Sequence, residues 1–168
     1  DNEEQEAIKK LLPSWWEYEL LAQDESDMTR KDDIYNEGLK AYPTSHQLMG
    51  NYANFLNLVR RNEDAEKFYL KALNLEANHS NHNGNYANFL IKSKRYNEAE
   101  PYCIKALNYK PNSLTFNGNY AYLLQMLNKL ADSEFYYKKT ISIDPNSLTC
   151  NANYSPNKRR KRKSHNLY

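Results

Sequence analysis

Asparagine side chains recur at a fixed interval along this chain. Asn51 and Asn54 are followed 34 residues later by Asn85 and Asn88, and Asn119 and Tyr122 stand another 34 residues downstream. A primary amide offers two N–H donors and a carbonyl acceptor, which match the groups that a peptide backbone presents. These residues are therefore candidates for binding an extended polypeptide. The alternative is that they are solvated polar positions in a chain rich in asparagine.

Other residue types that carry chemistry form no recognisable constellation in the sequence. His79 and His82 lie three residues apart without a third ligand nearby, and Cys103 and Cys150 are not at zinc-binding spacing. No serine or cysteine stands at a recognisable spacing from a histidine and a carboxylate. We expect no catalytic residue, no metal and no cofactor, and we expect Cys103 to be a small core residue.

A run of six basic residues lies close to the end of the sequence. It comprises Lys158, Arg159, Arg160, Lys161, Arg162 and Lys163, and without it the chain has 17 basic and 21 acidic residues. Three interpretations stay open: a solvated end, a nuclear-import signal, or an electrostatic arm for nucleic acid or an acidic protein surface. No aromatic residue interleaves the run, so stacking on bases is not favoured.

The elements that must position these residues follow the same period. Gly50, Gly84 and Gly118 are 34 residues apart and begin similar segments, such as Gly50-Asn-Tyr-Ala-Asn-Phe-Leu56. In that segment and just before it, Met49, Tyr52 and Leu56 share one face of a predicted helix. A second helical pattern with alanines follows each copy, and Asn97 with Glu100 is typical of its capped start. Repeated glycine inside a helix indicates close packing on the neighbouring helix.

One such hairpin cannot bury both of its faces, so the copies must stack. The period, the pairs such as Tyr52-Ala53, the small residues such as Ala65 and Ala99, and closing prolines such as Pro111 resemble the tetratricopeptide repeat. The resemblance covers residues 12–147, with clear copies at 46–79, 80–113 and 114–147. A degenerate copy spans 12–45, where Lys31 occupies the position of Ala65 and Ala99. The resemblance implies an all-α fold, a right-handed α-solenoid of stacked antiparallel helix hairpins.

In this family the first helix of each repeat lines a concave groove. The resemblance therefore implies a partner-binding groove formed by Asn51, Asn54, Asn85, Asn88, Lys92, Asn119, Tyr122 and Met126. Only Lys92 is cationic in the groove-facing rows that we expect, so a clamp for a carboxylate is not favoured. The expected ligand is an uncharged extended segment or a helix of a protein partner.

We expect three regions: an N-terminal helical extension at 1–11, the repeat array at 12–147, and a truncated repeat with the basic tail at 148–168. The outer face of the last full repeat, around Phe135, Tyr136 and Ile143, is expected to be covered by another chain. With a mean hydropathy of -0.98 and two cysteines, we expect a cytoplasmic protein without a membrane span, and the tail leaves a nuclear location open.

The sequence thus predicts a non-catalytic scaffold for protein–protein interaction. The competing interpretation is a structural subunit of a large assembly, ribonucleoprotein or cytoskeletal (axonemal), anchored by its open C-terminal edge and its basic tail.

Overall fold

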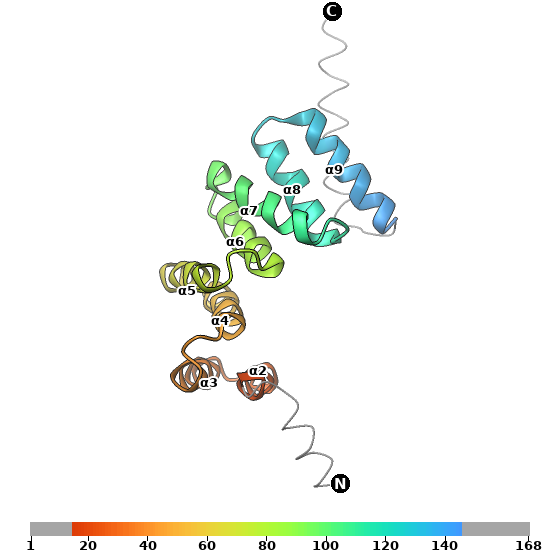
Figure 1. Cartoon of the computed structure of the whole chain (residues 1–168). Helices are drawn as coiled ribbons and strands as arrows, with labels where there is room; N and C mark the ends of the chain where they lie inside the picture. Colours follow the sequence, from red (N-terminus) through yellow and green to blue (C-terminus); the bar gives the residue numbers. More distant parts are fainter. Residues whose placement is uncertain (1–14, 146–168) are drawn as a thin grey trace, which may run out of the picture. The chain divides into compact units, whose positions relative to one another are not determined.

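The computed structural model describes residues 15–145, and within that range it contains eight α-helices and no strand. They are α2 (Trp15–Asp24), α3 (Met28–Ala41), α4 (His46–Leu58), α5 (Asn62–Leu75), α6 (Ser80–Lys92), α7 (Tyr96–Tyr109), α8 (Leu114–Met126) and α9 (Leu130–Ile143). Helices α2 to α5 belong to one compact unit that ends at Ala77, and α6 to α9 belong to a second that begins at Asn78. Within each unit, consecutive helices pair as hairpins (Figure 1).

This arrangement confirms the predicted all-α fold of helix hairpins. The boundaries between the predicted regions stay a prediction, although each predicted repeat holds one hairpin. The predicted extension at 1–11 and the region 148–168, with its basic run, lie outside the described residues. None of the described helices is long and apolar enough to cross a lipid bilayer.

The first helix of each later hairpin begins at a capping residue in the same repeat position. The Ser45 hydroxyl accepts a hydrogen bond from the Leu48 N–H at 3.2 Å, and the Ser113 hydroxyl accepts one from the Phe116 N–H at 3.4 Å. In α6 the cap is His79, whose Nδ1 accepts from the His82 N–H at 3.4 Å. These bonds satisfy donors at the helix start that have no partner within the helix.

The first helices α4, α6 and α8 are each followed, two residues after their last helical residue, by a residue with left-handed backbone geometry. The φ angles are 63° at Arg60, 60° at Lys94 and 60° at Asn128. The N–H of the next residue returns to the helix, as from Arg95 to the Leu90 carbonyl at 2.9 Å, which is the Schellman pattern. This turn also explains why the predicted cap of α7 is wrong. The turn closes so early that Arg95 is the N-cap residue, without a side-chain cap, and Asn97 lies inside the helix.

Glycine at the left-handed position should stabilise the protein. Replacing Lys94 by Gly removes a steric cost of about 1–2 kcal/mol from the folded state. Glycine also makes the unfolded chain more flexible, and this offsets part of the gain in stability. We expect the free energy of unfolding to rise by about 0.5–1 kcal/mol in urea titrations. The matched control is Ser93→Gly one residue earlier, where φ is -78° and glycine should only destabilise. Equal effects of the two substitutions would contradict this account.

Two glycines sit where another helix approaches closely. A Cβ at Gly84 would lie 2.6 Å from Phe116 Cζ, and a Cβ at Gly38 would lie 2.8 Å from both Tyr18 Cγ and Leu48 Cδ2. Real Cβ atoms do not approach other atoms this closely, so both positions exclude a side chain without rearrangement. Packing against a neighbouring helix therefore accounts for these glycines.

Two buried asparagines, Asn83 and Asn117, lie near the starts of the first helices α6 and α8. The Asn117 Nδ2 donates to the carbonyls of Pro111 and Ser113, both at 2.8 Å. In the preceding repeat, Asn83 Nδ2 donates to the His79 carbonyl at 3.0 Å. These amides tie each first helix to the turn before it, so they are structural and do not belong to the predicted groove.

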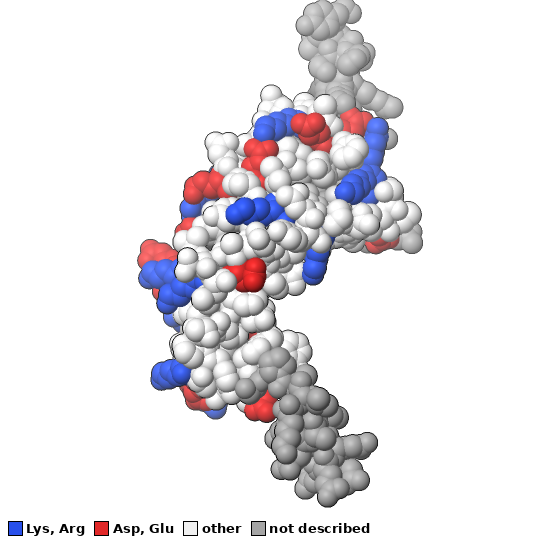
Figure 2. Space-filling view, in the orientation of Figure 1, with Lys and Arg blue, Asp and Glu red and all other residues white. Residues whose placement is uncertain are grey.

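Charged side chains connect successive hairpins at the surface. Arg61 contacts Asp32 at 2.9 Å, and Lys129 contacts Glu100 at 2.6 Å in the second unit. On the face in Figure 2, blue and red side chains are interspersed among uncharged ones on each unit, without a large field of either sign. Such exposed pairs each contribute little to the free energy of unfolding, so their main effect is on how neighbouring hairpins align.

Candidate functional site

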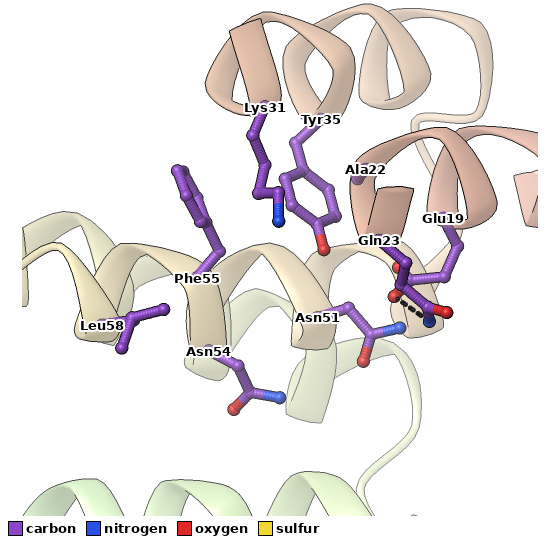
Figure 3. A pocket seen from close by; sticks show the side chains of 9 residues that line it. All are labelled: Glu19, Ala22, Gln23, Lys31, Tyr35, Asn51, Asn54, Phe55 and Leu58. Carbon is purple, nitrogen blue, oxygen red and sulfur yellow. Dashed lines mark hydrogen bonds between the residues drawn. The ribbon is translucent and has the colours of Figure 1, made fainter. Parts of the chain in front are cut away.

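The predicted groove residues of the first unit line a hollow of about 250 Å³. Asn51, Asn54 and Leu58 reach it from α4, and residues of α2 and α3 close it from the other sides (Figure 3). The full lining comprises Glu19, Ala22, Gln23, Lys31, Tyr35, Asn51, Asn54, Phe55 and Leu58. The structure therefore places two of the predicted groove residues, Asn51 and Asn54, together, and it adds the charged neighbours Glu19 and Lys31.

The orientation of Asn54 is fixed by a buried tyrosine. The Tyr69 hydroxyl of α5 donates to Asn54 Oδ1 at 2.8 Å. Burial raises the pKa of Tyr69 well above its usual value, so the phenol keeps this proton. With the oxygen engaged, the Asn54 amide is left to act mainly as a donor.

Glu19 is the most unusual residue of the hollow because its side chain is charged and only 4% exposed. Oε1 accepts a hydrogen bond from Gln23 Nε2 at 3.0 Å. Oε2 is buried and, within residues 15–145, has no hydrogen-bond partner. Burial, together with the charge of Glu19, raises the pKa of Tyr35 well above its usual value. The hollow thus contains a carboxylate whose hydrogen bonding is only half satisfied.

Lys31 brings a positive charge into the same hollow. It comes from α3, is half-buried, and forms no ion pair with the residues that the structure describes. Lys92 is still the only cation in the groove-facing rows predicted from the sequence, and Lys31 adds a cation from outside those rows. Those rows lie on first helices alone, whereas Lys31 reaches the hollow from α3, the second helix of its hairpin.

Both charges occupy positions that carry small residues in the later hairpins. Glu19 aligns by the 34-residue period with Ala53, Ala87 and Ala121. Lys31 aligns with Ala65, Ala99 and Ser133, all of which are fully buried. Opposite charges at two small-residue positions of one hairpin are visible in the sequence, although Lys31 by itself indicates only a degenerate repeat.

In the second unit the predicted residues lie on α6 and α8, which contact each other. Asn85, Asn88 and Asn119 are half-buried, while Tyr122 and Met126 are exposed. Among residues 15–145, no hydrogen bond to the side-chain amides of these three asparagines is present. Lys92 is exposed near the end of α6. The fold presents these groups unpaired, and their assignment to a binding site stays a prediction.

The histidines and the cysteine considered for chemistry, His79, His82 and Cys103, lie at a helix start or in the core. The rings of His79 and His82 lie 3.9 Å apart, and Nδ1 of His79 serves as the cap of α6. Cys103 is buried on α7 as predicted, and burial with the nearby charge of Glu100 raises the pKa of its thiol to about 12. A thiol with that pKa is protonated at neutral pH and is a poor nucleophile.

A stack of antiparallel helix hairpins with polar groups on its first helices defines a helical-repeat protein. Residues 83–113 match the family model of the tetratricopeptide repeat, and the chain has the fold of tetratricopeptide-repeat structures. A comparison with curated proteins gives no significant match.

Solved structures with this fold include proteins of low sequence identity. MamA (41-end) from Desulfovibrio magneticus RS-1 has a TM-score of 0.79 at 15% identity, over 88% of this chain and 85% of that one. YrrB, described as a tetratricopeptide-repeat protein with an unusual peptide-binding site, has a TM-score of 0.74 at 16% identity, over 86% and 74%. The first such domain of Spaghetti (RPAP3), bound to the HSP90 peptide SRMEEVD, has a TM-score of 0.66 at 15% identity, over 68% and 91%. At these identities the similarity establishes the fold alone.

Proposed function

We propose that the chain is a non-catalytic scaffold that binds a segment of a partner protein through asparagines on its first helices. One observation carries this proposal. Asn51 in the first unit, and Asn85, Asn88 and Asn119 in the second, are half-buried amides without a hydrogen-bond partner among the described residues. Such an amide has no partner within the described fold, so its donors and its acceptor are available to a ligand in place of water.

The spacing of such helices suits an extended polypeptide. Adjacent packed helices lie about 8–10 Å apart, and an extended chain rises about 3.3 Å per residue. On the contacting helices α6 and α8 of the second unit, one asparagine position would therefore meet about every third residue of the ligand. Because amides pair with backbone N–H and C=O groups, they hold the ligand without reading its side chains. The peptide-bound domain of Spaghetti and the peptide-binding site described for YrrB support a peptide as the ligand.

The test uses Asn85→Ala with Asn119→Ala in one chain. Peptides of nine residues are selected from a random phage-displayed library on the wild-type protein, and their Kd values are measured by fluorescence anisotropy. Each lost hydrogen bond costs about 0.5–1.5 kcal/mol, so we expect binding to weaken about tenfold or more. The matched control is Asn97→Ala with Asn108→Ala, since both residues are exposed on α7. Equal affinities of the two double variants would contradict the proposal.

A second candidate function is that of a structural subunit whose last hairpin packs on another chain. Phe135 is 61% exposed and Ile143 is 38% exposed on α9, the last described helix. Exposed large apolar side chains of this kind favour a covered surface.

The basic run Lys158–Lys163 would add an electrostatic anchor to that candidate function. Deleting 157–168 should then weaken association with a polyanion, and only this association should fall steeply with salt. Under peptide binding by asparagines, the same deletion should leave the affinity for the selected peptides unchanged.

A further inference from the structure

We propose that the hollow between α2, α3 and α4 takes one basic side chain of the bound polypeptide, an arginine or a lysine, with Glu19 as its counter-ion. This inference deepens the proposed function and rests on it for the statement that the ligand is a polypeptide. It adds a selective position to a surface whose asparagines do not distinguish side chains.

The buried carboxyl group of Glu19 lacks part of its hydrogen bonding. A buried carboxylate is normally paired with a cation or surrounded by donors. Here Gln23 serves Oε1, whereas Oε2 is buried without a donor among residues 15–145. The later hairpins fold with alanine at this position, as at Ala53 and Ala87. The fold therefore does not require the charge, and a cationic ligand would complete its bonding.

The remaining lining of the hollow also suits a basic side chain. A guanidinium carries five N–H donors and no acceptor, so it needs several oxygens around it. Gln23 and Asn51 place amide groups beside Glu19, as Figure 3 shows. Ala22 and Leu58 offer apolar surface for the aliphatic part of a long basic side chain. A volume of about 250 Å³ is smaller than the usual site of a whole small molecule and suits one side chain.

Lys31 decides where the basic group lies. In Figure 3, Lys31 and Glu19 stand on either side of Tyr35. Repulsion by the ammonium directs a cation to the Glu19 side, and it favours an acceptor in the ligand, such as a backbone carbonyl, on the Lys31 side. An anion held by Lys31 is the rival occupant. Burial favours the cation, because Lys31 is still partly hydrated whereas Glu19 is not.

The experiment titrates the full chain with single-residue probes and follows backbone amide resonances by NMR. The probes are N-acetyl-arginine methylamide, the corresponding norleucine derivative and the corresponding glutamate derivative, at low ionic strength. We expect saturable shifts around Gln23 and Asn51 with the arginine probe alone. Glu19→Gln should weaken this binding at least fivefold. Glu17→Gln on the same helix is the matched control, since Glu17 is exposed, and it should bind like the wild type.

Stability measurements keep the test decisive. Glu19→Gln removes a buried charge, so its melting temperature should equal or exceed that of the wild type, and unfolding would not explain a loss of binding. Should Glu19→Gln fail to fold, Glu19→Asp keeps the charge on a shorter side chain. The arginine probe should bind Glu19→Asp more weakly than it binds the wild type. It should still bind Glu19→Asp more tightly than the norleucine probe does.

Three results would overturn the inference. The first is that the arginine probe gives no saturable shift. The second is that Glu19→Gln binds the arginine probe as tightly as the wild type does. The third is that the glutamate probe binds more tightly than the arginine probe and that Lys31→Ala abolishes this binding. The proposed function fails separately. If the selected peptides show no enriched basic residue, the basic subsite is wrong and peptide binding stands. If the arginine probe binds but no peptide can be selected, peptide binding is wrong and the basic subsite stands.

Discussion

Raising the pH from about 10 to about 12 is expected to unfold the protein cooperatively. Burial, with the hydrogen bond and charge of Asp32, raises the pKa of Tyr52 to about 12, and burial with the charge of Glu100 raises that of Tyr120 to about 12. The pKa values of Tyr35 and Tyr69 are also raised, mainly by burial. In the unfolded chain a tyrosine ionises near pH 10. Above that pH the unfolded state loses protons that the folded state retains, so stability falls as pH rises.

The size of this effect is comparable with the whole stability of a domain. One pKa unit corresponds to about 1.4 kcal/mol, and several tyrosines contribute together, against a usual total of about 5–15 kcal/mol. The contribution is fully present below pH 10 and is lost as the pH rises through the folded-state pKa values. The measurement follows tyrosinate absorbance and helical circular dichroism in the same titration, and the two signals should change together.

Single substitutions separate buried from exposed tyrosines. Tyr52→Phe removes one ionising group from the core, so the alkaline midpoint should move to higher pH relative to the stability of that variant at neutral pH. Tyr109→Phe is the matched control because Tyr109 is exposed at the end of α7, and its midpoint should equal that of the wild type. Ionisation of all tyrosines near pH 10 without loss of helix would contradict this prediction.

The fold could be predicted because the information is repeated. A 34-residue period fixes which residues share a helix face, and the positions of Tyr52, Tyr86 and Tyr120 in the core follow from it. Local exceptions escaped because several local patterns compete for the same role. Asn97 and Glu100 satisfy the pattern of a helix start, yet the left-handed turn at Lys94 begins the helix earlier.

The candidate site was predicted only in part, for a related reason. The asparagines repeat with the period and were found, whereas Glu19 and Lys31 are departures from it. A residue that departs from the period occurs only once, so the repeat pattern does not indicate its role. Only the tertiary packing of α2, α3 and α4 shows that these two charges line the same hollow. The degenerate hairpin, which weakens the repeat pattern most, thus supplies both charged side chains of the hollow.

Gly84→Ala is expected to destabilise the protein by up to about 2 kcal/mol, although alanine is the better helix former. Helix propensity alone predicts a gain of about 1 kcal/mol. The new Cβ, however, would lie 2.6 Å from Phe116 Cζ, and the ring is only 9% exposed and has little room to move. Overpacking of this kind costs about 1–3 kcal/mol, so it outweighs the propensity term. Urea titration of both proteins measures the difference.

A double-mutant cycle identifies the ring as the cause. Phe116→Leu shortens the side chain that faces Gly84, and by itself it should destabilise through lost packing. In that background Gly84→Ala should be neutral or stabilising, because the propensity gain remains and the clash is relieved. The coupling between the two sites should therefore be favourable by at least about 1 kcal/mol. Additive effects would mean that the glycine is retained for a reason other than the approach of Phe116, and the packing explanation for Gly84 would then be wrong.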